Sequence, residues 1–118
     1  MSENYPTRFE ALRALLGKLG HELPGPMAGF VKLHQESVSK GALEPKFKEL
    51  IALGIGIAQR CDSCIAYHVH DALKAGASRA EIIETLGVAI MMGGGPATMY
   101  ACDALVALNE FEAQARNA

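Results

Sequence analysis

Residues 60–68 hold the side chains best suited to chemistry, beginning with Cys61 and Cys64. Two cysteines at this spacing can alternate between a dithiol and a disulfide if the turn between them permits it. Asp62 and Ser63 are good N-cap residues, so we expect Cys64 to lie in the first turn of a helix. Unpaired backbone N–H groups and the helix dipole favour a thiolate there. The pair therefore predicts thiol redox chemistry.

A histidine follows the second cysteine by one helical turn. His68 lies four residues after Cys64, on the same face of the expected helix. Its imidazole can accept the thiol proton or stabilise the resulting thiolate. His70 points roughly 240° around the helix from Cys64, at about 100° per residue. We therefore expect His68, and not His70, to share the site.

A single carboxylate stands at the edge of the apolar run that precedes the cysteines. Glu49 is the only charged residue between Lys48 and Arg60. A buried carboxylate needs a partner or a raised pKa, and bonding to His68 would orient the ring for a proton relay. In antiparallel helices that turn near Arg60, Glu49 lies about 15 Å and His68 about 7 Å from the turn. Side-chain length, a bridging water, a tilted crossing or a neighbouring subunit must absorb the difference.

Helical periodicity, interrupted by Pro and Gly, organises the whole chain, and no run alternates with period two. We expect an all-α fold of about six helices with short connections. The first helix is expected to begin at a capping box over 7–10 and to end at Gly20, before a turn at 24–26. The others are expected at 26–39, at 45–59, from Asp62 or Ser63 to Gly76, from a second capping box at 78–81, and from Pro96 onward.

Length and charge limit the classes of protein to which the chain can belong. Its 118 residues suggest one domain over 1–118, and its net charge of −2 argues against nucleic-acid binding. The N-terminus does not resemble a signal peptide, and the uncharged runs are too short or too broken to span a membrane. Three cysteines without a secretion signal argue against a structural disulfide framework. We therefore predict a cytoplasmic protein.

Residues 50–58 are apolar on every side of their expected helix. Such a helix must be buried on every side, and full enclosure is hard to achieve in a domain of this size. We therefore predict a homo-oligomer. The alternative is a central helix wrapped by the other five.

Structural roles explain the remaining cysteine, histidine, methionine and glycine residues better than metal binding does. Structural zinc normally needs a second ligand pair far along the chain, so we predict neither a metal nor a cofactor at the cysteines and histidines of 61–70. Buried structural thiols would need neither an N-cap nor a neighbouring imidazole. We interpret Cys102 as a small core residue and 93–95 as a tight turn between helices. Surface or capping histidines and core methionines complete the set: His21, His34, Met91, Met92 and Met99.

Four of these residues share one spacing, Glu-x11-Cys-x2-Cys-x3-His, which Glu49, Cys61, Cys64 and His68 fill. The pattern resembles the AhpD-like alkylhydroperoxidase branch of the carboxymuconolactone decarboxylase family. The resemblance extends beyond the motif to residues 45–53, 76, 81–82 and 94–97.

This resemblance implies an all-helical fold that assembles into homo-oligomers, as trimers or hexamers. It also implies an antioxidant, thiol-dependent peroxidase that acts on a hydroperoxide substrate. In such an enzyme Cys64 attacks the hydroperoxide, Cys61 resolves the sulfenic acid, and His68 with Glu49 relays protons. A thioredoxin-like or lipoyl-bearing protein would then restore the dithiol. Ser63 stands where some relatives have a histidine, so a relay through that extra imidazole is not expected.

Other functions stay open at this stage. The decarboxylase branch of the family lacks the cysteine pair, so the motif argues against lactone decarboxylation. One alternative is a dithiol–disulfide adapter that passes electrons to a peroxiredoxin, which protein-to-protein turnover would favour. A second is a redox-sensing helical oligomer without catalysis, which normal function of a Cys64→Ser variant would favour.

Overall fold

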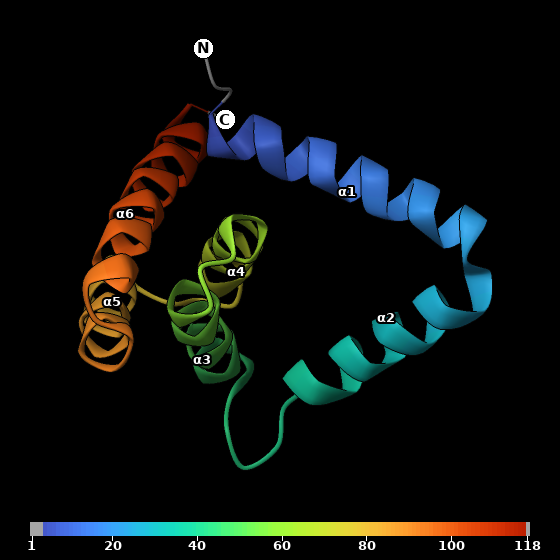
Figure 1. Cartoon of the computed structure of the whole chain (residues 1–118), viewed down its shortest axis with the longest axis horizontal. Helices are drawn as coiled ribbons and strands as arrows, with labels where there is room; N and C mark the ends of the chain where they lie inside the picture. Colours follow the sequence, from blue (N-terminus) through green and yellow to red (C-terminus); the bar gives the residue numbers. More distant parts are fainter. Residues whose placement is uncertain (1–3, 118) are drawn as a thin grey trace.

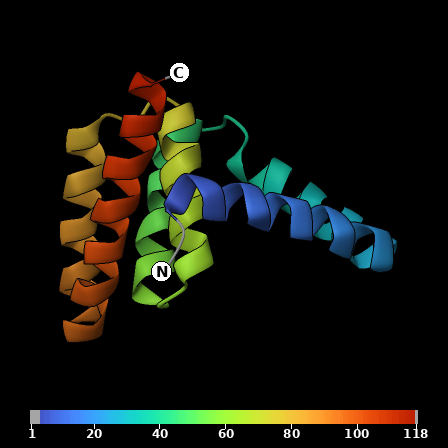
Figure 2. The same cartoon turned by 90° about the horizontal axis from the view of Figure 1, so that it is seen from above.

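The computed structural model describes residues 4–117, and these residues form helices and no strand. The helices are α1 (Tyr5–Glu22), α2 (Pro24–Val38), α3 (Pro45–Ala58), α4 (Asp62–Lys74), α5 (Arg79–Gly93) and α6 (Gly95–Arg116). The all-α prediction is confirmed. Helices α3 to α6 form a bundle, and α2 with most of α1 projects from it as an arm (Figures 1 and 2). We call α2 and the part of α1 after Phe9 the α1–α2 arm.

The core lies among the four bundle helices. Helix α3 packs most extensively against α4 and α5, and α6 covers α4 and α5. Alanines line the inner face of α6, so that helix can approach its neighbours closely. The largest fully buried side chains are Leu53, Ile57, Ile65, Val69, Ile82 and Leu108.

The turn between α3 and α4 determines where the cysteines lie. Arg60 has a left-handed φ of 60°, which costs a residue other than glycine about 1–2 kcal/mol. The Cys61 backbone N–H then donates to the Gly56 carbonyl at 2.9 Å. The chain reverses within three residues of α3, so α4 starts beside the end of α3.

The start of α1 differs from the prediction. The Asn4 side chain accepts the Thr7 backbone N–H at 2.9 Å, so Asn4 is the N-cap. Thr7 therefore lies inside the first turn, and the predicted capping box at 7–10 is wrong. The helix also continues past Gly20 to Glu22, because glycine weakens a helix without ending it.

The predicted turn at 24–26 is also wrong, since both prolines lie in the first turn of α2 and the break falls at Leu23. Proline fits a first helical turn because the N–H it lacks has no partner there. The capping box at 78–81 is confirmed: Ser78 N–H donates to Glu81 Oε1 at 2.8 Å, and Glu81 N–H donates to Ser78 Oγ at 3.1 Å. The first of these bonds lowers the pKa of the Glu81 carboxyl. The tight turn at 93–95 is confirmed at Gly94, whose φ is 74°.

Part of the apolar surface expected in the core lies outside it. Ile51 and Ile55 of α3 are 51% and 52% exposed, so neighbouring helices do not wrap α3. Every residue of α2 is described, and none is buried. None of the described helices is long and apolar enough to cross a bilayer.

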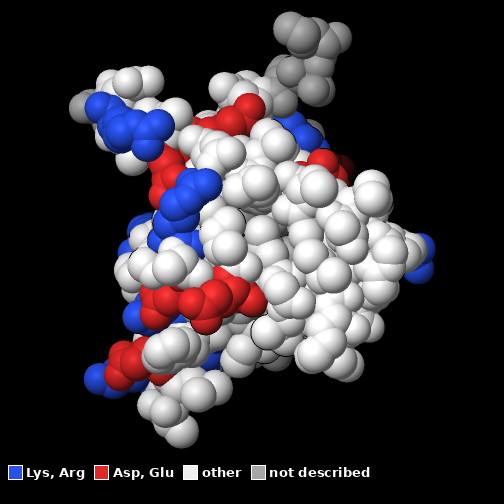
Figure 3. Space-filling model, turned by 90° about the vertical axis from the view of Figure 1, so that its left-hand side faces the viewer, with Lys and Arg blue, Asp and Glu red and all other residues white. Residues whose placement is uncertain are grey.

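The interpretations of Cys102 and of the methionines as core residues are wrong, because all of them are exposed. Small residues of α5 and α6 such as Ala89, Ala97 and Ala101 fill the inward positions instead. The methionines therefore point outward from a segment, 85–102, that carries no charged residue. On the side of the molecule formed by α5 and α6, a broad uncharged area accordingly lies beside a region where charged side chains gather (Figure 3). The exposed methionines are Met91, Met92 and Met99.

Candidate active site

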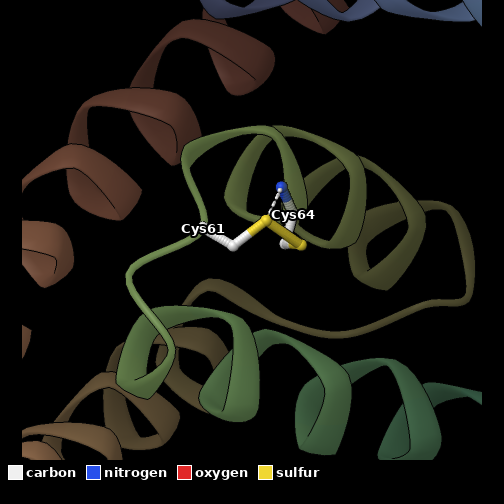
Figure 4. The surroundings of a disulfide bond; sticks show 2 residues. All are labelled: Cys61 and Cys64. Atoms are coloured by element: carbon white, nitrogen blue, oxygen red, sulfur yellow. Dashed lines mark hydrogen bonds between the residues drawn. A yellow bond between two sulfur atoms is a disulfide. The ribbon is translucent and has the colours of Figure 1, made fainter.

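The two cysteines form a disulfide at the start of α4, with their Cα atoms 5.2 Å apart (Figure 4). Cys61 is the N-cap of the helix, and its Sγ accepts the Cys64 backbone N–H at 3.2 Å. The prediction that Cys64 lies in the first turn is confirmed. The N-cap role predicted for Asp62 or Ser63 is wrong, because the sulfur of Cys61 takes that position.

Asp62 instead ties the start of α4 to α1. Its carboxylate accepts a hydrogen bond of 2.7 Å from the Tyr5 hydroxyl and forms an ion pair with Arg8. The Arg8 guanidinium also lies over the Tyr5 ring, 4.4 Å from its centroid. Burial raises the pKa of the Tyr5 hydroxyl, with Asp103 adding to the shift. Arg8 thus offsets a negative charge that would otherwise oppose a thiolate at the neighbouring cysteine.

Glu49 and His68 are in direct contact within one chain. Glu49 Oε1 lies 2.8 Å from His68 Nδ1, and Glu49 is only 5% exposed. No bridging water or neighbouring subunit is needed for this contact. With Nδ1 engaged, Nε2 is the ring nitrogen left to exchange a proton with a thiol. His68 lies one turn of α4 after Cys64, on the same face of the helix.

Helix α3 passes close to the second cysteine at Gly56. A Cβ built at Gly56 would lie 3.0 Å from the Cβ of Cys64, closer than most side-chain contacts allow. The glycine therefore makes room for the cysteine pair against α3. The spacing of residues in the sequence could not single out this role.

His70 lies apart from the cysteines, as expected. Its Nδ1 is 2.8 Å from Asp71 Oδ1, and its ring stacks on Phe9 with the centroids 4.0 Å apart. The four residues weighed as zinc ligands are thus not gathered around one point, since the two sulfurs are bonded to each other and His70 turns toward α1.

The sequence patterns did not predict that His34 lies beside the candidate site. It is half-buried on α2, and a nitrogen of its ring lies within 4.8 Å of a carboxylate oxygen of Glu49 and of Asp71. The interpretation of His34 as a surface or capping histidine is therefore wrong. No local signal could have found this contact, because it depends on how α2 folds back toward α3.

An apolar groove of about 350 Å³ runs between α3 and α5. Its lining includes Ile51, Ile55, Val88 and Met92, and none of its lining residues is charged. Gln59, at the end of α3 and two residues before Cys61, also lines it. The groove lies along the side of α3 on which Ile51 and Ile55 are exposed.

Together these features define a helical protein with a Cys-x-x-Cys disulfide at a helix N-terminus and a partly buried Glu–His pair one turn away. The sequence model of the carboxymuconolactone decarboxylase family matches residues 24–107. The chain belongs to this family.

Relatives and solved structures resemble most of the chain. An uncharacterised protein of Cupriavidus necator is 35% identical over 105 residues, which is 89% of this chain and 93% of that protein. A family member from Legionella pneumophila, solved in an apo form, is 42% identical with a TM-score of 0.86, covering 91% of this chain and 96% of its own.

A family member from Thermotoga maritima is 32% identical with a TM-score of 0.74, covering 79% of this chain and 96% of its own. A role in the antioxidative response has been suggested for that protein.

Proposed function

We propose that the chain is a thiol-dependent peroxidase that reduces organic hydroperoxides through Cys61 and Cys64. The observation that carries the proposal is the cysteine pair in the first turn of α4 with the Glu49–His68 pair one turn further on. In this proposal the four side chains, which come from two adjacent helices, serve as nucleophile, resolving thiol, general base and the group that orients the base.

In the first step His68 Nε2 takes the Cys64 thiol proton, and the thiolate attacks the hydroperoxide. An S–O bond forms as the O–O bond breaks. Cys64 is oxidised to a sulfenic acid, and the departing alkoxide takes the proton from His68 and leaves as an alcohol. Glu49 holds the ring and stabilises the imidazolium that forms between these proton transfers.

In the second step Cys61 attacks the Cys64 sulfur, so that an S–S bond forms and the S–O bond breaks. The oxygen leaves as water with the proton of the Cys61 thiol. An external dithiol then supplies two electrons and two protons and restores both thiols. The N–H of Cys64 donates to Cys61 Sγ, and this hydrogen bond favours a thiolate on Cys61. That thiolate is the attacking group when the disulfide forms and the leaving group when the disulfide is reduced.

The reaction class and the reductant follow from the cysteine pair. The suggested antioxidative role of the Thermotoga relative agrees with this chemistry. A thioredoxin-like or lipoyl-bearing protein fits the dithiol requirement, and a reducing compartment such as the cytoplasm would sustain it.

The direct test is a steady-state assay with catalytic amounts of the protein, tert-butyl hydroperoxide and dihydrolipoamide. Hydroperoxide loss proportional to the protein concentration is expected, with no other protein present. Loss of hydroperoxide only after a peroxiredoxin is added would instead identify the chain as an electron-passing adapter.

We further propose that the chain assembles into a homo-oligomer, a trimer or a hexamer. The exposed face of α3 and the α1–α2 arm leave many large apolar side chains uncovered, and such exposed apolar faces mark interaction sites. In a symmetric homo-oligomer, a second copy of the chain covers this apolar surface in the same way on every subunit. Exposed apolar residues on the arm are Leu15, Leu19, Leu23, Phe30, Val31 and Leu33.

An Ile55→Asp substitution is expected to reduce the molecular mass seen by sedimentation velocity. A carboxylate buried at an apolar interface without a partner is costly, whereas Ile55 is half exposed in the single chain and tolerates the change there. Asn109→Asp, on the exposed face of α6, is the matched control and should keep the mass of the parent protein. A monomeric parent protein, or an Ile55→Asp variant that keeps the full mass, would contradict the assembly.

A further inference from the structure

We propose that His34, Glu49 and Asp71 form a binding site for one divalent cation, best suited to Zn²⁺, where α2, α3 and α4 meet. One ligand atom from each residue lies within 4.8 Å of the other two. One imidazole and two carboxylates are ligands that zinc accepts, leaving a fourth position for water. Atoms bound to zinc at about 2.0–2.1 Å lie roughly 3.3 Å apart, so modest side-chain movement completes the site.

Both carboxylates are already oriented from outside the cluster. His68 Nδ1 lies 2.8 Å from Glu49 Oε1, and His70 Nδ1 lies 2.8 Å from Asp71 Oδ1. Carboxylates that bind metals are typically held in this way by hydrogen bonds from a second layer of residues. Each carboxylate has a second oxygen with which it can face the cation.

The charge of the cluster also favours a cation. Glu49 is nearly fully buried, and Asp71 is half-buried close by. Two carboxylates held this close repel each other, and burial strengthens the repulsion. A divalent cation between them replaces this repulsion by attraction, and His34 supplies a neutral third ligand.

A cation here would attach α2 to the bundle. Every residue of α2 is described and none is buried, so apolar packing contributes little to its position. Lys48 Nζ donates to the Ser39 carbonyl at 2.7 Å, just beyond the end of α2. Coordination by His34 would add a second, stronger link from the last turns of this helix to α3 and α4.

The site is tested by titrating Zn²⁺ alone into the oxidised full-length chain and measuring the heat released. The disulfide keeps Cys61 and Cys64 from binding zinc, and a Cys102→Ser background removes the remaining thiol. One zinc ion per chain is expected. His34→Ala and Asp71→Asn should each weaken binding by at least about tenfold, the loss that even an outer-layer partner causes.

Matched controls separate the site from surface binding. His21→Ala and Asp103→Asn each remove an exposed residue of the same type and should leave the affinity unchanged. Zinc should also slow amide hydrogen exchange in α2 of the parent protein and not in the His34→Ala variant. Absence of zinc binding, or equal binding by His34→Ala and the parent protein, would overturn the proposal. Because the oxidised chain meets no peroxide in these measurements, the result does not depend on the proposed peroxidase activity.

Discussion

A Cys64→Ser variant is expected to lose hydroperoxide turnover by more than about 10³-fold, close to the uncatalysed rate. Serine cannot form the thiolate that attacks the O–O bond, and no other group on α4 replaces it. The loss should appear in the steady-state assay with tert-butyl hydroperoxide. Cys102→Ser is the matched control, because it makes the same change at an exposed thiol outside the site and should keep full activity.

The companion variant Cys61→Ser separates the two cysteine roles. It should react once with hydroperoxide and stop with a sulfenic acid on Cys64, which dimedone labels and mass spectrometry locates. A label on Cys61 in the Cys64→Ser variant, with none on Cys64 in the Cys61→Ser variant, would reverse the order of attack. Equal residual activity in both variants would contradict the assignment of peroxide attack to Cys64 and of resolution to Cys61.

Glu49→Gln is expected to reduce turnover by about 10²-fold, a typical contribution of a general acid–base group. The amide has nearly the shape of the carboxylate, so the substitution removes the charge that stabilises the His68 imidazolium while keeping the contact seen at 2.8 Å. The rate of the peroxide step in rapid mixing measures this effect directly. A thermal melt on the same sample measures stability.

The control for this variant is Glu44→Gln, which changes an exposed carboxylate at the N-cap of α3 and should leave the rate unchanged. Glu49→Gln should fold normally and react slowly. An unfolded variant would make Glu49 a structural residue, and an unchanged rate would remove it from the proton relay.

The periodicity of the sequence was sufficient to predict the helices, but not where each begins. Local periodicity shows which residues share one face of a helix. It does not show which of several suitable N-cap residues accepts the first free backbone N–H groups. Asn4 caps α1, although Thr7 begins a capping-box pattern, and Cys61 caps α4, although Asp62 is the stronger candidate by residue type. At α4 the sulfur of Cys61 accepts the N–H because the Asp62 carboxylate is engaged by Tyr5 and Arg8.

The sequence was sufficient to identify most residues of the candidate site, but not to predict their contacts. Glu49 was identified because a lone carboxylate beside an apolar run must find a partner. Its direct contact with His68 depends on how α3 and α4 pack, which spacing alone does not determine. His34 was out of reach for the same reason, because α2 comes beside α3 only through the tertiary fold.

The surface was the least predictable part of the chain. Met91 and Met92 lie in an apolar segment whose periodicity does not reveal which face turns inward, and both are exposed. A sequence pattern records apolar faces without stating whether the same chain or another copy covers them. The exposed side of α3 shows this ambiguity most clearly, since Ile51 and Ile55 belong to a helix that is apolar all round.

The most direct test of the central proposal is a single turnover without any reductant. The fully reduced protein, freed of added thiol, is mixed with one equivalent of tert-butyl hydroperoxide, and alcohol and disulfide are measured together. One alcohol formed per chain, with the Cys61–Cys64 disulfide appearing at the same rate, is the predicted result. Hydroperoxide that persists while both cysteines stay reduced would contradict a peroxidase.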